Sequence, residues 1–448
     1  MTTLRRTLNL RDMTLLTVGA VIGSGIFLVP GSVLRQLNGL ILPAMLVWFS
    51  GGLLSLLGAL TYCELGAMKP AAGGLYVYIR DCFGRFPAFL FGWTLFFVIT
   101  SGAVATLAVA FTAYLGEIVP LNPLAGKAVA ILIIAVMATV NVLGTRASAE
   151  LQNWTTAIKV TGILLMSFVL LWLGRGFEGT SQELWPAVYS RSLLSGFGLA
   201  MIGVLWAYEG WQYVTYSAGE VIDPQRNLPK GLLTGTAALI VIYLLANIGY
   251  LFALGPAGVA NSNRLAATAV ATVVGPQAAK LIALIILVSI FSAANSTMLT
   301  APRVYYAMAR DGLFFQKLAL VHPQFNTPAF AIVSGAAWSA VLAITGTFEQ
   351  LLTYVVFIGW FFYALAAASI FVYRRQLPEV ARPYRVPGYP WTPLLFIVAA
   401  IALVLNTIVT QPVRAMIGIG IVLLGAPAYL IWRSSAENID QTIVTEKL

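Results

Sequence analysis

The sequence predicts an all-α membrane protein with twelve transmembrane helices and with both termini in the cytoplasm. Three observations lead to this fold class. The 448 residues are 59% hydrophobic and only 9% charged, whereas soluble domains have about 25% charged residues. Apolar residues form runs of about 20, the length at which a helix crosses a bilayer. Basic residues gather in alternate connections between these runs.

The expected spans follow one another without a hydrophilic linker long enough to separate soluble domains. They lie at residues 12–34, 40–62, 86–115, 127–145, 153–174, 193–218, 232–254, 277–308, 328–346, 351–373, 392–410 and 413–432. We therefore expect a single transmembrane domain over residues 1–432, surrounded by the lipid bilayer, and a cytoplasmic tail over residues 433–448. The first apolar run is too long for a cleavable signal peptide.

The distribution of positive charge predicts the orientation. Arg80, Arg226, Arg310 and Arg374 belong to one set of alternate loops, which holds most of the Lys and Arg residues. Cytoplasmic loops carry the excess of basic residues, so this set and both termini are expected in the cytoplasm. The net charge of +10 then reflects membrane topology, and no nucleic-acid partner is expected.

The composition argues against a metal site, a cofactor or an enzyme. The chain has two cysteines, Cys63 and Cys82, and a single histidine, His322. These offer neither a disulfide framework nor a histidine-based metal centre. A membrane enzyme would need a clustered nucleophile, acid–base pair or metal set, and the sequence shows none. A channel would need a continuous polar pore instead.

Two glycine-containing breaks interrupt the first and the sixth expected spans, at Gly23-Ser24-Gly25 and at Glu209-Gly210. A break at membrane depth leaves backbone groups unpaired, which is tolerated where they line a cavity. Corresponding breaks in two halves indicate the substrate site of a transporter. Four intact spans separate the two breaks. We therefore predict two five-helix repeats of opposite orientation, over residues 1–174 and 193–373, followed by two additional helices over residues 392–432.

The first break has the chemistry of an anion site. A half-helix that begins near Gly25 would direct free N–H groups and the positive end of its dipole at the cavity, which suits a carboxylate. Ser24 adds a hydroxyl. The alternative is a packing face of small residues between membrane helices.

The second break has the chemistry of a cation site. Glu209 is an acidic residue at membrane depth, which is costly and indicates function. Unwinding here would direct the carbonyls of Trp206 and Glu209 at an ammonium group, and Trp206 could lie over the substrate as an aromatic lid. Ordinary packing remains the alternative for Trp206. Together the two breaks would supply both sites that a free α-amino acid needs.

Other polar residues at span ends and within spans have simpler interpretations. Glu64 and Glu220 lie near the cytoplasmic ends of spans and are expected to pair with loop arginines. Asn247 and Asn295 lie within spans and are expected to make hydrogen bonds between helices; a contact with substrate is the alternative.

The sequence resembles the amino acid–polyamine–organocation superfamily and, within it, the L-type amino acid transporters. The motifs occur in the family's order along almost the whole chain. They are Gly23-Ser24-Gly25-Ile26-Phe27, Gly73 to Tyr78, Trp206 to Trp211, Gly219 to Pro229, Pro302-Arg303 with Ala309 to Gly312, and Arg382 to Pro390.

The resemblance implies the leucine-transporter fold and sodium-independent exchange of L-α-amino acids by alternating access. It places the substrate carboxylate on the N–H groups around Ser24, Gly25 and Ile26, and the amine on carbonyls of Val21 and of the second break. Trp206 stands where the family often has a gating aromatic residue. The expected substrate-binding residues are Val21, Gly23, Ser24, Gly25, Ile26, Trp206, Ala207, Glu209 and Gly210.

The resemblance also bears on partners. Animal members of this family are disulfide-linked to a heavy subunit through a cysteine in the external loop after the third helix. Here that loop, over residues 116–126, contains no cysteine. The chain therefore resembles a stand-alone prokaryotic member, expected in the bacterial cytoplasmic membrane without a disulfide-linked heavy subunit.

Lys159 is a basic residue deep within the fifth expected span. Sodium-coupled relatives in this fold bind a cation between helices one and eight, and a fixed lysine charge could take that place. Candidate partners are a carbonyl near Gly19 and the hydroxyls of Ser289 and Ser292. The alternative is a lysine long enough to reach the interface.

Neutral amino acids are the expected substrates. The alternative function is proton-coupled uptake with Lys159 or Glu209 titrating. Cationic amino acids or polyamines are the further candidate substrates of this alternative, since the carboxylate of Glu209 could pair with a second positive charge.

Overall fold

The computed structural model describes residues 4–116, 118–177, 184–185, 191–262, 264–345 and 348–445. In these ranges the regular elements are helices, apart from one isolated bridge between Leu8 and Val221. Nine helical stretches of the described chain are long and apolar enough to cross a membrane, and the bent pair α1 and α2 makes a tenth. The expectation of an all-α polytopic membrane protein is therefore confirmed.

The first part of the chain contains nine helical elements. They are α1 (Leu10–Val21), α2 (Gly25–Gln36), α3 (Ile41–Met68), α4 (Leu75–Phe83), α5 (Arg85–Thr94), the π-helix η1 (Leu95–Ile99), α6 (Thr100–Gly116), α7 (Pro123–Leu143) and α8 (Thr145–Leu173). The α5, η1 and α6 elements run on as one span. The π-helical turns were not predicted from the sequence.

The second part begins with another interrupted span. Its elements are α9 (Arg191–Ala207), the 3-10 helix η2 (Trp211–Glu220), α10 (Pro224–Asn261), α11 (Leu265–Val273), α12 (Pro276–Thr300), α13 (Pro302–Arg310), the 3-10 turn η3 (Gln316–Ala319), α14 (Ala329–Thr345), α15 (Phe348–Gln376), α16 (Trp391–Thr410) and α17 (Pro412–Thr445).

Two of the expected spans fall on α14 and α15. The first is a shorter apolar helix of 17 residues, and residue 346 of its expected range lies outside the described residues. The α17 helix continues past residue 432 into the expected tail, of which residues 446–448 lie outside the described chain.

The outer surface of the bundle is apolar. Trp172 and Val409 are 76% and 79% exposed, and many other large aliphatic side chains are exposed with them. Contiguous apolar surface of this kind is unfavourable in water and is the surface that a helix presents to lipid chains. The interior is filled by buried aromatic residues, among them Trp48 and Trp211.

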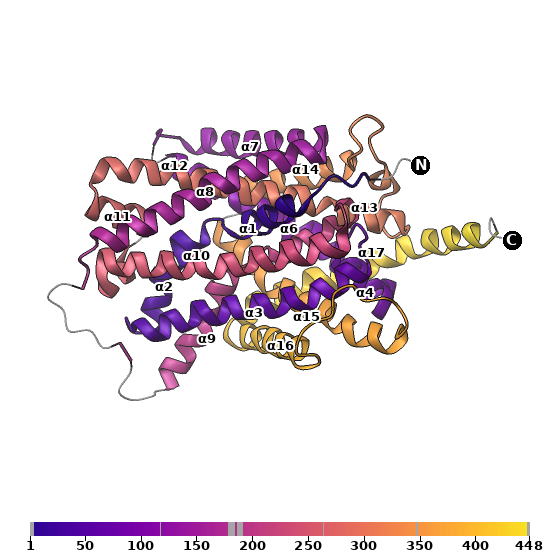
Figure 1. Ribbon diagram of the computed structural model, residues 1–448. Coiled ribbons are helices and arrows are strands. Elements are labelled where there is room, and N and C mark those ends of the chain that lie inside the picture. Colours follow the sequence, from indigo (N-terminus) through magenta and orange to yellow (C-terminus); the bar gives the residue numbers. More distant parts are fainter. Residues whose placement is uncertain are drawn as a thin grey trace.

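The long helices lie side by side, and both ends of the described chain lie at the same end of the bundle (Figure 1). The α4 and α13 helices lie at this end, and α11 lies at the opposite end (Figure 1). The α1 helix packs against α8, α10 and α12, so its broken end is enclosed by three other helices.

Two buried carboxylates are paired as predicted. Glu220 forms an ion pair of 2.5 Å with Arg303, and neither side chain is more than 1% exposed. Thr145 bridges the pair, because its hydroxyl donates to Glu220 and accepts from Arg303. Glu64 accepts two hydrogen bonds from Arg374, at 2.8 and 2.7 Å. These contacts close the end of the bundle where the chain termini lie.

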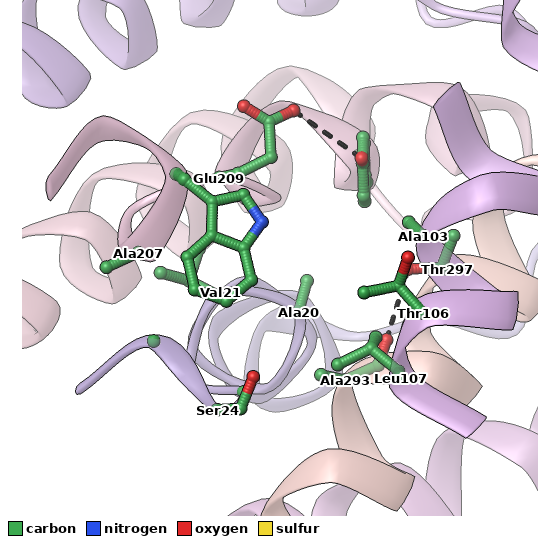
Figure 2. A pocket seen from close by; sticks show the side chains of 14 residues that line it. Ala20, Val21, Ser24, Ala103, Thr106, Leu107, Ala207, Glu209, Ala293 and Thr297 are labelled. Atoms are coloured by element: carbon green, nitrogen blue, oxygen red, sulfur yellow. Dashed lines mark hydrogen bonds between the residues drawn. The ribbon is translucent and has the colours of Figure 1, made fainter. Parts of the chain in front are cut away.

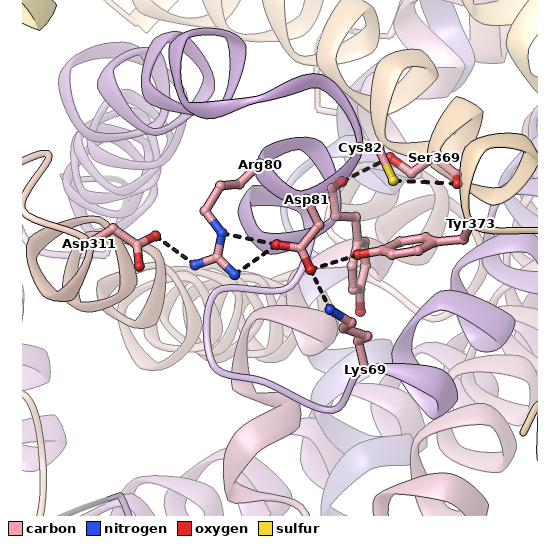
Figure 3. A network of polar contacts seen from close by, with 8 residues as sticks. Lys69, Arg80, Asp81, Cys82, Asp311, Ser369 and Tyr373 are labelled. Carbon is pink, nitrogen blue, oxygen red and sulfur yellow. Dashed lines mark hydrogen bonds and ion pairs between the residues drawn. The ribbon is translucent and has the colours of Figure 1, made fainter. Parts of the chain in front are cut away.

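A network around α4 joins further elements at the same end (Figure 3). Arg80 donates to Asp311, while Lys69 and Tyr373 donate to Asp81. Burial alone would raise the pKa of Asp81, but the hydrogen bonds from Lys69 and Arg80 outweigh it and the pKa is lowered. The carboxylate of Asp81 therefore stays ionised. The network connects α4 to α15 and to Lys69 and Asp311, the residues that directly follow α3 and α13.

The two intramembrane asparagines differ from each other. Asn295 of α12 donates to Gln152 of α8 and accepts from Asn141 of α7, so its predicted role between helices is confirmed. Asn247 donates to the carbonyl of Tyr243 in its own helix. The prediction of an interhelical bond is wrong for Asn247, because the carbonyl four residues before it lies within reach of its amide.

Candidate functional site

The first break separates α1 from α2 by three residues and bends the chain by 46°. The α1 helix ends at Val21 because Ile22 has extended backbone angles (φ −72°, ψ 94°). The α2 helix begins at Gly25, and Ser24 precedes it without a capping hydrogen bond from its side chain. The N–H groups of Gly25 and Ile26 therefore begin a helix without partners four residues earlier.

Gly25 permits the close approach of the two broken helices. A Cβ atom at this position would lie 2.8 Å from both the Cα and the Cβ of Ala207, and 3.4 Å from the ring of Trp206. Contacts of 2.8 Å to backbone cannot be relieved without moving a helix. The absence of a side chain thus brings the start of α2 against the end of α9.

The second break changes the type of helix. The α9 helix ends at Ala207, residues 208–210 form a turn, and the chain continues as the 3-10 helix η2. Gly210 has φ +120°, and a Cβ there would lie 2.8 Å from the carbonyl oxygen of Ala20. The expected unwinding is thus limited to one turn, and Gly210 is required by both its conformation and its contact with α1.

The carboxylate of Glu209 is held by side chains of the protein. Its Oε1 atom accepts hydrogen bonds from Gln212 at 2.6 Å, from Tyr363 at 2.5 Å and from Tyr213 at 3.5 Å. Three donors on one oxygen stabilise a charge-bearing group at membrane depth.

Tyr243 of α10 connects the two breaks. Its hydroxyl lies 3.2 Å from the carbonyl oxygen of Val21 and 2.9 Å from that of Ala207. One buried donor thus holds the last carbonyls of α1 and α9 side by side. The sequence analysis missed this residue; a tyrosine within an apolar span was the available signal.

A cavity of about 60 Å³ lies between the breaks. This is several times the roughly 10–15 Å³ that one water needs. Figure 2 shows Val21, Ala207 and Glu209 on one side and Thr106 and Thr297 on the other. The lining residues are Ala20, Val21, Gly23, Ser24, Gly25, Ala103, Thr106, Leu107, Trp206, Ala207, Glu209, Tyr213, Ala293 and Thr297.

Seven of the nine predicted substrate-binding residues line this cavity: Val21, Gly23, Ser24, Gly25, Trp206, Ala207 and Glu209. Ile26 and Gly210 are not among the lining residues. The side chain of Ile26 is fully buried, so only its N–H could serve a ligand, and Gly210 faces the carbonyl of Ala20.

The sequence analysis missed the wall that α6 and α12 contribute. It consists of Ala103, Thr106 and Leu107 from α6 and of Ala293 and Thr297 from α12. Two buried hydroxyls that line the cavity, those of Ser24 and Thr106, have no hydrogen-bond partner within the described chain. An unpaired hydroxyl at membrane depth is costly, and both belong to the surface that a ligand would contact.

Lys159 lies behind the first break. Its side chain is fully buried, and its ammonium donates to the carbonyl of Gly19 at 2.7 Å and to that of Ile22 at 2.5 Å. Ser289 donates to the same carbonyl of Ile22 and to that of Gly23. Ser292 instead accepts from Gln152. The predicted carbonyl contact is therefore present, whereas neither serine is itself a partner of Lys159.

Within the described residues there is no group of three or more His, Cys, Asp and Glu side chains that could hold a metal ion. The site consists of backbone groups at helix ends, hydroxyls and one carboxylate, which suits a small zwitterion.

Sequence comparison agrees with this geometry. Residues 8–427 match the amino acid permease family. The chain belongs to this family. The match confirms the predicted resemblance to the amino acid–polyamine–organocation superfamily, and it covers both breaks, the cavity wall and Lys159.

Several members of the family have sequences similar to this chain over most of their length. A serine/threonine exchanger of Bacillus subtilis is 31% identical over 429 residues, covering 95% of this chain and 96% of the relative. The mouse b(0,+)-type amino acid transporter 1 is 31% identical, covering 92% and 84%. The human cystine/glutamate transporter is 29% identical, covering 98% and 90%.

The two glycines of the first break give a matched pair of substitutions. A Cβ at Gly23 would make ordinary contacts of 3.5 Å with Ala293 and 3.6 Å with Leu107, so Gly23→Ala should fold and fill part of the cavity. Gly25→Ala must separate α2 from α9 and should lower the melting temperature of the protein in detergent. We expect the first variant to lose ligand binding at an unchanged melting temperature. Equal destabilisation of both variants would contradict this assignment.

Proposed function

We propose that the protein is a sodium-independent exchanger of neutral L-α-amino acids that works by alternating access. The observation that carries the proposal is the convergence of two interrupted helices on one cavity. The N-terminal end of α2 and the C-terminal ends of α1 and α9 meet there. A helix N-terminus attracts a carboxylate and a helix C-terminus attracts an ammonium group.

The carboxylate is assigned to the start of α2. The N–H groups of Gly25 and Ile26 precede the first full turn of this helix, and the unpaired hydroxyl of Ser24 lies at the cavity. Together they are donors for an anion of the size of a carboxylate group.

The α-amine is assigned to carbonyls at the ends of α1 and α9. The carbonyl of Val21 accepts from Tyr243, and that of Trp206 accepts from the N–H of Glu209 at 3.0 Å. Because a carbonyl oxygen has two lone pairs, each retains capacity for a donor from the substrate. The ring of Trp206 borders the same cavity, a position suited to the predicted lid.

The contacts of Glu209 favour neutral substrates. Its carboxylate already accepts from Gln212, Tyr213 and Tyr363. A cationic side chain would have to compete with donors that are held in place. This arrangement supports neutral amino acids over the cationic amino acids or polyamines of the alternative hypothesis.

The order of elements supports the predicted inverted repeat of the leucine-transporter fold with twelve spans. In each half an interrupted helix is followed by a long helix, a nine-residue helix and three further spans. The nine-residue helices, α4 and α11, lie at opposite ends of the bundle (Figure 1), as opposite orientation of the two halves requires. The repeats would correspond to residues 1–174 and 193–373, with α16 and α17 as the additional helices.

Lys159 supports sodium independence. Its ammonium donates to the carbonyl of Gly19 in α1 and to that of Ile22 in the break. The hydroxyl of Ser289 in α12 also donates to the carbonyl of Ile22. Oxygen atoms in this arrangement would coordinate a cation in a coupled transporter. A covalently attached charge removes the need for a bound ion.

The orientation and surroundings follow from the charge distribution. We place both termini and the paired residues Glu220 and Arg303 on the cytoplasmic side, in agreement with the positive-inside rule. A location in the bacterial cytoplasmic membrane, without a disulfide-linked heavy subunit, fits the Bacillus subtilis relative and the cysteine-free loop at residues 116–126.

The proposal is tested with purified protein in liposomes. Uptake of labelled alanine should rise several-fold when the liposomes are preloaded with alanine, and it should be equal in sodium, potassium and choline media. Empty liposomes and protein-free liposomes are the controls. A strict requirement for sodium would contradict sodium independence. Uptake that follows a pH gradient without internal amino acid would contradict exchange.

The role of Lys159 is tested by Lys159→Ala, with the exposed Lys280→Ala as matched control. Loss of a buried donor costs roughly 1–3 kcal/mol, which changes the balance of inward- and outward-facing states about five- to a hundredfold. We expect slower exchange and altered apparent affinity for Lys159→Ala, and wild-type behaviour for Lys280→Ala. Unchanged exchange in Lys159→Ala would make this lysine a structural residue only.

A further inference from the structure

Thr106 has an unusual hydrogen-bonding state for a threonine in a membrane helix. Such residues commonly donate to the carbonyl four residues before them. Thr61, Thr94 and Thr236 do so, at 2.9, 2.7 and 2.8 Å. Thr106 is only 3% exposed, yet its hydroxyl has no partner in the described chain.

The hydroxyl of Thr106 belongs to the cavity wall opposite the helix breaks. Figure 2 shows Thr106 and Thr297 on this side, with Val21, Ala207 and Glu209 across the cavity. The charged ends of an α-amino acid are assigned to the breaks, so its side chain extends toward α6 and α12. On this wall the hydroxyl of Thr106 is a polar group without a partner in the described chain.

The dimensions of this wall restrict the side chain to a short one. A Cβ atom added to Gly23 would reach ordinary contact with Ala293 and Leu107, at 3.5 and 3.6 Å. The cavity between these residues is therefore about one methyl group wide at this level. The limit on side-chain length therefore comes from the small distance between the first break and this wall.

The chemistry of the wall selects a neutral polar group. Ala103, Thr106, Leu107, Ala293 and Thr297 carry no charge, and the hydroxyl of Thr297 already donates to the carbonyl of Ala293 at 3.1 Å. A buried hydroxyl is stabilised by a ligand that can donate to it or accept from it, and is left unpaired by an apolar ligand.

We infer that Thr106 determines specificity and selects amino acids whose short side chain carries a hydroxyl group. This inference rests on the proposed function, because it takes the breaks as the site of the α-carboxylate and α-amine. Threonine and valine have nearly the same shape, so their comparison isolates the hydroxyl. Threonine should be preferred to valine, and serine to alanine.

The test measures exchange of labelled alanine in liposomes and its inhibition by threonine, valine and serine. In the wild type threonine should inhibit at a concentration about five- to a hundredfold lower than valine, the range expected for one buried hydrogen bond. In Thr106→Val this ratio should fall to near one or reverse, with inhibition by each amino acid measured against that variant's own rate of alanine exchange. Thr106→Ser should keep the preference for threonine.

Thr112→Val is the matched control. Thr112 lies on the same helix, and its hydroxyl donates to the carbonyl of Val109 at 2.8 Å outside this cavity. The wild-type ratio of threonine to valine should remain in this variant.

The possible outcomes distinguish a failure of the role of Thr106 from a failure of the proposed exchange function. Absence of alanine exchange in the wild type would overturn the proposed function. Alanine exchange with equal inhibition by threonine and valine would overturn only the inference. A ratio unchanged in Thr106→Val would also overturn it, because the hydroxyl would then not contact the substrate.

Discussion

The structure depends on one constraint, which is that a membrane helix cannot end within the bilayer unless other groups satisfy its backbone. Two helices end there in this protein, α1 at Val21 and α9 at Ala207. Their carbonyls are partly satisfied from behind, by Lys159, Ser289 and Tyr243. Toward the cavity the N-terminal end of α2 and the remaining lone pairs stay available. In the proposed function, the same irregularity that costs stability would supply an α-amino acid with complementary partners.

This arrangement explains why the polar groups around the breaks are distributed unequally. The side of the first break that faces α8 and α12 is occupied by an ammonium and a hydroxyl of the protein itself. Between the break and α6 lie two buried hydroxyls without a partner in the described residues, that of Ser24 in the break and that of Thr106 on α6. On the side of α8 and α12, hydrogen bonds from Lys159 and Ser289 hold the break in its shape. On the side of α6, polar groups without a hydrogen-bond partner favour the binding of a ligand.

The sequence alone predicted those features that depend on the type of a single residue within its span. Glycines in apolar runs indicated both breaks, and an isolated charge indicated that Lys159 would contact α1 near Gly19. Features that depend on packing between distant spans could not be predicted. The wall of Thr106 and Ala293 forms because α6 packs against α12, and nothing local to either helix indicates this. The close approach of Gly210 to Ala20 of α1, just before η2, likewise depends on packing between distant spans.

The central claim, that the two breaks bind the two charged groups of an α-amino acid, is tested most directly by competition with labelled alanine for the detergent-purified protein. Alanine, alaninamide and lactate differ in these groups: the second lacks the carboxylate and the third lacks the amine. Hydrogen bonds to charged groups contribute about 1.5–3 kcal/mol, so alaninamide and lactate should each compete about ten- to a hundredfold more weakly than alanine. Competition by alaninamide at the same concentration as alanine would contradict the assignment of the carboxylate to α2.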